Sequence, residues 1–117
     1  TEQDPQPGTP EFDQALSSAR RAVSLKPSLG PAHTVLAKLY MATSRYPEAV
    51  AECRRALQDD PADQTALYDL VRALRKTDQK SEIPGLLKQL AAVRQQANNK
   101  KREENRFKLV EGNSQSQ

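Results

Sequence analysis

The side chains best suited to chemistry are a single histidine, a single cysteine and two glutamates one helical turn apart. His33 has no serine or cysteine nucleophile at a helical spacing that would pair with it, and no acid there to orient its ring. Glu48 and Glu52 have the spacing of a carboxylate pair, but the helix that carries them has Ala49 and Cys53 on its other face, so we expect both glutamates to be solvated. We therefore predict no catalytic residue, and we interpret His33 as a helix-surface or packing residue.

Metal and cofactor sites are not indicated either. Cys53 is the only cysteine, which excludes an internal disulfide and most cysteine metal sites, because those sites need several ligands. We expect it to be a small buried thiol. The sequence has no glycine-rich loop to hold a phosphate and no cluster of metal-ligating residues. We predict no metal and no cofactor.

The positive charge lies in the second half of the chain. The formal net charge is +3, and residues 61–117 carry 11 basic and 7 acidic side chains, against 7 and 8 in residues 1–60. Nucleic-acid binding is one function this suggests, through Arg94, Lys100, Lys101, Arg102, Arg106 and Lys108. Glu103, Glu104 and Glu111 are interleaved with them, Lys100 and Glu104 have the spacing of an intrahelical ion pair, and aromatic residues for base stacking are few. Nucleic-acid binding is therefore kept only as an alternative.

The elements that would position such residues follow an internal repeat. Residues 11–27 align with residues 45–61 without a gap and at a constant offset. The aligned pairs are Phe12 and Tyr46, Ala15 and Ala49, Ala19 and Cys53, Ala22 and Ala56, Val23 and Leu57, and Pro27 and Pro61. A fixed period of about 34 residues is typical of stacked helical hairpins.

The second copy resembles the tetratricopeptide repeat family. With Gly30 as the first position, the large, small, aromatic, small, small and proline positions of the family pattern are Leu36, Ala37, Tyr40, Ala49, Ala56 and Pro61, and His33 replaces the first aromatic residue. The resemblance implies an all-α fold of antiparallel hairpins stacked as a short right-handed superhelix. Small residues fit this fold, because helix axes approach to about 8 Å only where small side chains lie between them.

The repeat pattern divides the chain into six segments. We expect a disordered leader over 1–8, a half repeat with only the second helix over 9–27, a complete repeat over 30–63, a degenerate terminal repeat over 64–93, a basic helical extension over 94–112 and a disordered tail over 113–117. The chain lacks a starting methionine, so we interpret it as a piece of a longer protein. No apolar run is long enough to cross a bilayer, and we predict no membrane partner.

Helix ends follow from capping residues and breakers. Thr9 and Asp63 should cap helices over 10–25 and 64–76, and two more helices should run over 30–43 and 47–58. A last helix should begin after Ser81 and continue to Glu111, with Gly112 as its left-handed cap. Its larger residues at the small positions should push it outward as a terminal unit; these are Ile83, Leu87 and Leu90.

The resemblance implies a peptide-binding groove lined by the first helix of each hairpin. Its positions are Thr34, Lys38, Met41 and Ala42, then Thr65, Tyr68, Arg72, Arg75 and Lys76. The basic members favour an acidic segment or a terminal carboxylate, although they could equally be solubilising charges. The family's binders of chaperone tails use Lys and Asn, and no Asn lies in either first helix here, so that activity is not implied.

The apolar residues at the C-terminal end pose a separate question. Phe107 lies roughly 20 Å beyond Val93 along a continuous helix, too far for the repeats to cover it easily. The helix could bend back, fray, or be covered by a second copy, and we hypothesise a symmetric dimer that shelters Leu86, Val93, Phe107, Leu109 and Val110. The function predicted overall is a non-catalytic protein-interaction module that binds a peptide segment or self-associates; a purely structural role in assembling a larger protein is an alternative.

Overall fold

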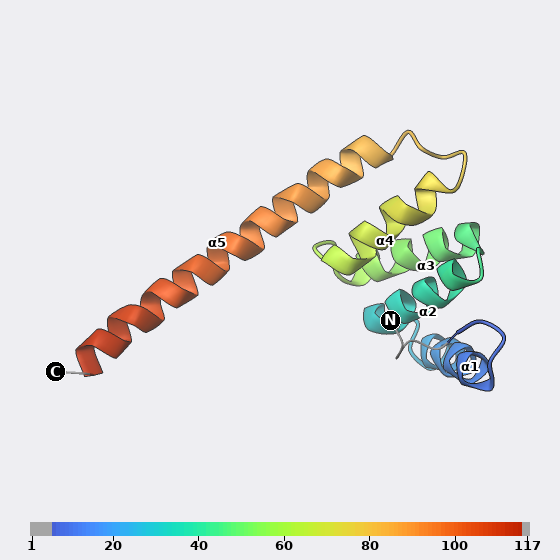
Figure 1. The fold of residues 1–117 in the computed structure, drawn as a ribbon, viewed down its shortest axis with the longest axis horizontal. Coiled ribbons are helices and arrows are strands. Elements are labelled where there is room, and N and C mark those ends of the chain that lie inside the picture. The colour runs from blue at the N-terminus through green and yellow to red at the C-terminus, as the bar shows by residue number, and fades with distance from the viewer. Residues whose placement is uncertain (1–5, 116–117) are drawn as a thin grey trace.

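The computed structural model describes residues 6–115, and within that range the chain forms five helices and no strand (Figure 1). They are α1 (Pro10–Leu25), α2 (Gly30–Ala42), α3 (Tyr46–Asp59), α4 (Gln64–Arg75) and α5 (Ile83–Gln115). Consecutive helices pack on one another, and α2 also contacts α4, so that α2 and α4 lie on the same face of the stack. The predicted all-α fold of helical hairpins is confirmed; the handedness of its superhelix stays a prediction.

Two helices, α1 and α4, begin at the predicted caps. The Thr9 hydroxyl accepts a hydrogen bond from the Phe12 amide at 3.2 Å, and Pro10 occupies the first turn, where its missing amide hydrogen costs nothing. Asp63 caps α4 in the same way, with its Oδ1 3.0 Å from the amide nitrogen of Ala66. These side chains satisfy amides that have no partner inside the helix.

The core is built where small residues let α2, α3 and α4 approach. Ala49, Cys53 and Ala56 on α3 are completely buried, as the repeat pattern predicts. Ala49 and Cys53 pack in one cluster with residues from the two flanking helices: Ala37, Leu70, Ala73 and Leu74. A methyl group or thiol at each close approach lets the larger leucines fill the remaining space.

Helix α1 is packed less completely than its repeat equivalent α3. Ala15 and Ala22 are only half-buried, whereas their counterparts Ala49 and Ala56 have no exposed surface. The difference arises because α3 is held between α2 and α4, while α1 contacts α2 alone among the described helices. The assignment of residues 9–27 to a half repeat stays a prediction.

A glycine opens α2 because that turn lies against the end of α3. A Cβ atom on Gly30 would lie 2.5 Å from Oδ2 and 3.0 Å from Cβ of Asp59, closer than van der Waals contact allows. Any larger residue would therefore displace the Asp59 side chain. The glycine lets the start of one helix meet the end of the next within the hairpin.

The last helix differs from the prediction at its C-terminal end. α5 passes through Gly112 and continues to Gln115, so the predicted cap at Gly112 is wrong, and residues 113–115 of the predicted disordered tail are helical. Glycine in a helix interior costs only about 1 kcal/mol relative to alanine, and no proline follows it to stop the helix. The predicted leader falls mainly on residues 1–5, and the end of the tail on 116–117; both lie outside the described residues.

Helix α5 extends well away from the stack, as Figure 1 shows. At 33 residues it is about 50 Å long, and among the described helices its main contact is with α4, near its own start. It accounts for the elongated dimensions of the molecule, 60 × 35 × 29 Å. Within residues 6–115, no helix combines the length and apolar character that a bilayer crossing requires.

Candidate functional site

A hollow of about 580 Å³ opens between α2 and α4, closed at one end by the start of α3. It lies between the first helices of the two hairpins, where the resemblance predicts a groove, and its role as a peptide-binding groove stays a prediction. Six of the predicted groove residues line it together, with one residue that was not predicted: Lys38, Met41, Ala42, Arg72, Arg75, Lys76 and the additional Tyr46. We call the hollow lined by these seven residues the cationic hollow.

Three predicted groove residues lie elsewhere. Thr34 is half-buried and its hydroxyl donates to the Gly30 carbonyl at 3.3 Å, so it serves its own helix. Thr65 and Tyr68 are exposed near the start of α4, outside the lining of the hollow. The guanidinium of Arg72 lies 5.6 Å from the centre of the Tyr68 ring, which orients that arginine.

Tyr46 is the residue of the hollow that sequence reasoning missed. It begins α3, is half-buried, and brings an aromatic ring beside the positive charges. Its signal was visible, because it aligns with Phe12 in the repeat and precedes a helix-starting proline. The alignment marked it as a packing residue and not as part of a binding surface.

The charges of the hollow are anchored by a buried aspartate on α4. Asp69 has no exposed surface; Nζ of Lys38 lies 2.9 Å from its Oδ2, and Nη1 of Arg72 lies 3.6 Å from its Oδ1. Both basic side chains remain about half exposed, at 53% and 50%. The carboxylate therefore holds one cation from α2 and one from α4 while leaving each of them accessible from the hollow.

The remaining two cations are not neutralised. Within the described chain, Arg75 and Lys76 form no ion pair, and no acidic residue lines the hollow. Four positive charges against one buried carboxylate leave a local excess of positive charge. Such a surface attracts carboxylates through charge-assisted hydrogen bonds.

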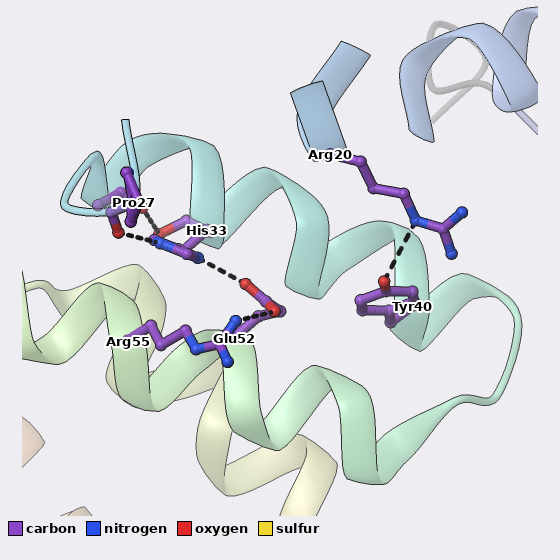
Figure 2. A network of polar contacts seen from close by, with 8 residues as sticks. Arg20, Pro27, His33, Tyr40, Glu52 and Arg55 are labelled. Carbon is purple, nitrogen blue, oxygen red and sulfur yellow. Dashed lines mark hydrogen bonds and ion pairs between the residues drawn. The ribbon is translucent and has the colours of Figure 1, made fainter. Parts of the chain in front are cut away.

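A second hollow, of about 560 Å³, lies between α1, α2 and α3 and contains the single histidine. Figure 2 shows a chain of polar contacts there. His33 Nε2 lies 2.6 Å from the Pro27 carbonyl oxygen and Nδ1 lies 2.5 Å from Oε2 of Glu52, whose Oε1 accepts from Arg55 at 3.1 Å. The network joins the α1–α2 turn to α2 and α3.

Two sequence interpretations are changed by this network. Glu52 was expected to be solvated, but it is only 7% exposed; Glu48, one turn earlier, is indeed solvated and pairs with Arg45 at 2.7 Å. His33 was interpreted as a helix-surface or packing residue, and it is buried; Glu52 of the neighbouring helix is the acid that orients its ring. The sequence spacing considered only partners on the same helix.

The geometry of His33 leaves neither ring nitrogen open to a substrate. The carbonyl of Pro27 can only accept, so Nε2 donates to it, and Nδ1 is occupied by the Glu52 carboxyl. Beside this network, Nε of Arg20 on α1 lies 3.4 Å from the Tyr40 hydroxyl, and the Arg45 guanidinium lies 4.7 Å from the Tyr40 ring centre. These contacts link α1 to α2 and α2 to α3, so the polar side chains of the second hollow stabilise the packing of the helices.

Cys53 is buried as predicted, and its environment makes a testable difference to stability. Burial, with a smaller contribution from the Asp69 carboxylate, raises the pKa of the Cys53 thiol from 9.0 to about 12. The unfolded thiol ionises first, so the unfolded state binds fewer protons above pH 9 and stability falls as pH rises. At pH 10 this thiol alone should lower the free energy of unfolding by about 1.4 kcal/mol relative to pH 8.

The matched control is Cys53→Ala, which copies Ala19 at the equivalent position of α1. Urea unfolding of both proteins at pH 8 and pH 10 measures the difference, and the alanine variant should lose less stability between the two conditions. An equal loss in both proteins would show that the thiol ionises as readily in the folded state as in the unfolded state.

The predicted self-association residues divide into two groups on α5. Leu86 and Val93 are half-buried near α4, and Leu86 packs against the core cluster. Phe107, Leu109 and Val110 are 65%, 70% and 60% exposed, so the repeats leave them uncovered, as the distance along the helix indicated. The second group is therefore exposed at the far end of the molecule, with Phe107 and Val110 about 60° apart around the helix and Leu109 on the other side.

Only three of the six basic residues of α5 lie along one side of the helix, at intervals of seven residues: Arg94, Lys101 and Lys108. At 100° per residue, the six side chains from Arg94 to Lys108 are distributed around the helix, and Glu103 and Glu104 lie among them. A phosphate backbone would meet only a few of them at once. This arrangement gives no support to the nucleic-acid alternative.

The chain matches a known protein family, although it matches no curated protein. A model of the family described as tetratricopeptide repeat matches residues 11–64 and residues 34–82. The two matches together cover residues 11–82, more than half of the chain. A search of curated proteins found no match.

Proposed function

Because the chain belongs to the tetratricopeptide repeat family, we propose that it binds an acidic segment of another protein in the cationic hollow. Repeats of this family generally mediate protein–protein interaction and are typically non-catalytic scaffolds. The proposal adds the site and the chemistry of the partner to that general role.

One observation carries the proposal: four cations surround a single hollow with no carboxylate on its lining. Ordinary solubilising charges on a helix are usually mixed in sign, and α1 and α5 of this protein show such mixing. Here the positive side chains come from two different helices and converge on one space. Arg72 and Arg75 can each grip a carboxylate with two hydrogen bonds, which favours Asp or Glu side chains or a chain terminus.

The hollow also offers apolar contact for the stem of a bound segment. Met41 and Ala42 of α2 and the ring of Tyr46 line it beside the charges. A volume of about 580 Å³ falls in the usual range of ligand sites, and it suits a few side chains of an extended segment more than the face of a folded domain. Affinity would come from the charges, and the apolar residues would favour carboxylates next to a small apolar side chain.

The test is binding of a fluorescent acidic peptide, rich in Asp and Glu, followed by anisotropy. The double variant Arg72→Glu, Lys76→Glu should bind about 10- to 100-fold more weakly, because two charge-assisted contacts become repulsive. Raising the salt concentration should weaken the wild-type interaction as well, since the hollow is open to solvent.

A matched control carries the same change of charge away from the hollow. Arg21→Glu, Lys88→Glu alters two exposed cations on α1 and α5, and its affinity should stay close to wild type after the change in net charge is allowed for. Equal weakening in the two double variants would mean that the peptide responds to net charge and not to this site. Unchanged affinity in the Arg72 and Lys76 variant would exclude the hollow.

Self-association is the second candidate function, favoured by the uncovered apolar residues at the end of α5. Phe107, Leu109 and Val110 lie close together in the sequence, and each is at least 60% exposed. Phe107 and Val110 also lie on neighbouring sides of the helix, and exposed large apolar side chains grouped in this way are a common sign of an interaction surface. The two candidate functions use different helices and could operate in the same molecule.

A further inference from the structure

The residues of α5 that are shielded from solvent follow a strict spacing. Between Ile83 and Val110, only Ile83, Leu86, Leu90 and Val93 are buried or half-buried. Their intervals of three, four and three residues are those of a coiled-coil seam, and this seam is the face that α5 turns toward α4. The pairing with α4 ends near Val93, but the helix does not.

The same face continues beyond α4 with a different set of side chains. Extending the spacing by four, three, four and three residues gives Ala97, Lys100, Glu104 and Phe107. All four are exposed, Phe107 by 65%. The face thus has a covered apolar half, from Ile83 to Val93, and an exposed half, from Ala97 to Phe107. The exposed half begins with a small residue and ends with a large aromatic one, and a cation and an anion lie between them.

We propose that the uncovered half of this face pairs with the same half of α5 in a second copy of the chain, in antiparallel orientation. This rests on self-association as a proposed function and specifies its geometry. The helices cross near Arg102, so that Lys100 of each copy faces Glu104 of the other copy, and Ala97 of each copy faces Phe107 of the other copy. Each large ring then meets a methyl group, and each cation meets an anion.

Charge complementarity selects the antiparallel arrangement. A parallel symmetric pair would place Lys100 opposite Lys100 and Glu104 opposite Glu104, and each of these like-charge contacts is unfavourable. Shifting the antiparallel register by one heptad toward α4 would require Leu90, which its own α4 already covers to 3% exposure. The register centred on Arg102 therefore combines opposite charges with the face that is free.

The proposed contact between the two helices is short, so we expect the dimer to have a low affinity. From Ala97 to Phe107 the contact is about 15 Å long, far less than the extent of standard protein interfaces. Lys101 and Lys108 border the face and add positive charge. Val110 lies at its edge and would be partly covered, whereas Leu109 points to the opposite side of the helix and takes no part. We expect association only at micromolar concentration or above.

The experiment is sedimentation equilibrium of the whole chain over a range of concentrations. Wild type should show a concentration-dependent monomer–dimer equilibrium. Lys100→Glu and Glu104→Lys should each weaken dimerisation by about tenfold or more, because each creates two facing pairs of like charge. The double variant Lys100→Glu, Glu104→Lys should recover most of the wild-type affinity, since the charges are exchanged but still opposite.

Arg102→Glu is the matched control for charge and helicity. Its side chain lies on the far side of α5, so it should leave the dimer within about threefold of wild type while changing the net charge as much as Lys100→Glu. Circular dichroism checks that none of these exposed substitutions unfolds the helix. Failure of the double variant to recover, or equal weakening by Arg102→Glu, would overturn the proposed register.

Orientation is tested by cross-linking in a Cys53→Ala background. A mixture of the single variants Ala97→Cys and Phe107→Cys should form a mixed disulfide much faster than either variant alone, because these positions face each other only in the antiparallel pair. Faster cross-linking within each single variant would favour a parallel pair and contradict the proposal. A wild type that stays monomeric at millimolar concentration would overturn self-association altogether, whereas a dimer insensitive to the charge reversals would overturn only this geometry.

Discussion

Replacing Leu70 with alanine is expected to lower the free energy of unfolding by about 2–5 kcal/mol. Leu70 is 1% exposed and packs in the cluster that joins α2, α3 and α4. Several of its neighbours there are small, among them Ala37, Ala49 and Ala73, and helix backbones surround them. Such a site cannot collapse to fill the space left by three carbon atoms, so the variant should keep most of the cavity.

The measurement is urea unfolding followed by circular dichroism, with Leu87→Ala as the control. Leu87 undergoes the same chemical change on α5 but is 42% exposed, so its cost should stay below about 1 kcal/mol. A domain of this size has little stability in reserve, and Leu70→Ala could populate the unfolded state at physiological temperature. Equal costs for the two substitutions would contradict the packing described for α4.

Replacing Glu52 with alanine is expected to cost about 3 kcal/mol of stability, the second large effect. The carboxyl group is the partner of His33 Nδ1 and also accepts from Arg55, in a site where the acid and imidazole side chains are 9% and 3% exposed. Its removal leaves a ring nitrogen buried without a hydrogen-bond partner and breaks the link between α2 and α3.

Glu48→Ala is the control for this prediction, since it removes the same group one turn earlier on the same helix. The Glu48 side chain is 42% exposed and pairs only with Arg45, so its loss should change stability by less than about 1 kcal/mol. Thermal and urea unfolding of both variants make the comparison. Glu52→Gln should fall between them, because the amide can still bond to the ring. Identical stabilities for the Glu48 and Glu52 alanine variants would show that the buried network contributes nothing.

Most of the fold could be predicted because the repeat fixes both periodicity and packing. The constant offset between the two copies placed Ala49 and Ala56 at close helix contacts, and both are fully buried. Thr9 and Asp63 indicated helix starts through local hydrogen bonds that depend on a few residues only. The end of α5 was harder, since glycine both caps helices and tolerates their interior, and nothing near Gly112 distinguishes the two cases.

The positions of most residues around the cationic hollow were predictable from the first helices, but the buried acids were not. Six predicted side chains line the cationic hollow. Asp69 and Glu52, by contrast, find their partners on another helix, at Lys38 and His33 respectively. Which charged residue turns inward depends on the angle between hairpins, and no local sequence pattern determines that angle. The one available signal for Asp69 was its place beside Ala66 and Leu70 on an apolar face.

Asp69 gives the stack a property that neither hairpin has alone. Its carboxylate contacts Lys38 of α2 and Arg72 of its own helix, α4. The same side chain therefore contributes to the packing between successive repeats and to the distance between these two positive charges. A ligand that moved Lys38 and Arg72 would therefore change their contacts with Asp69, and a rotation of one hairpin against the next would change the distance between the two cations. If the hollow binds an acidic segment as proposed, this one buried side chain would couple ligand binding to the packing of the two repeats.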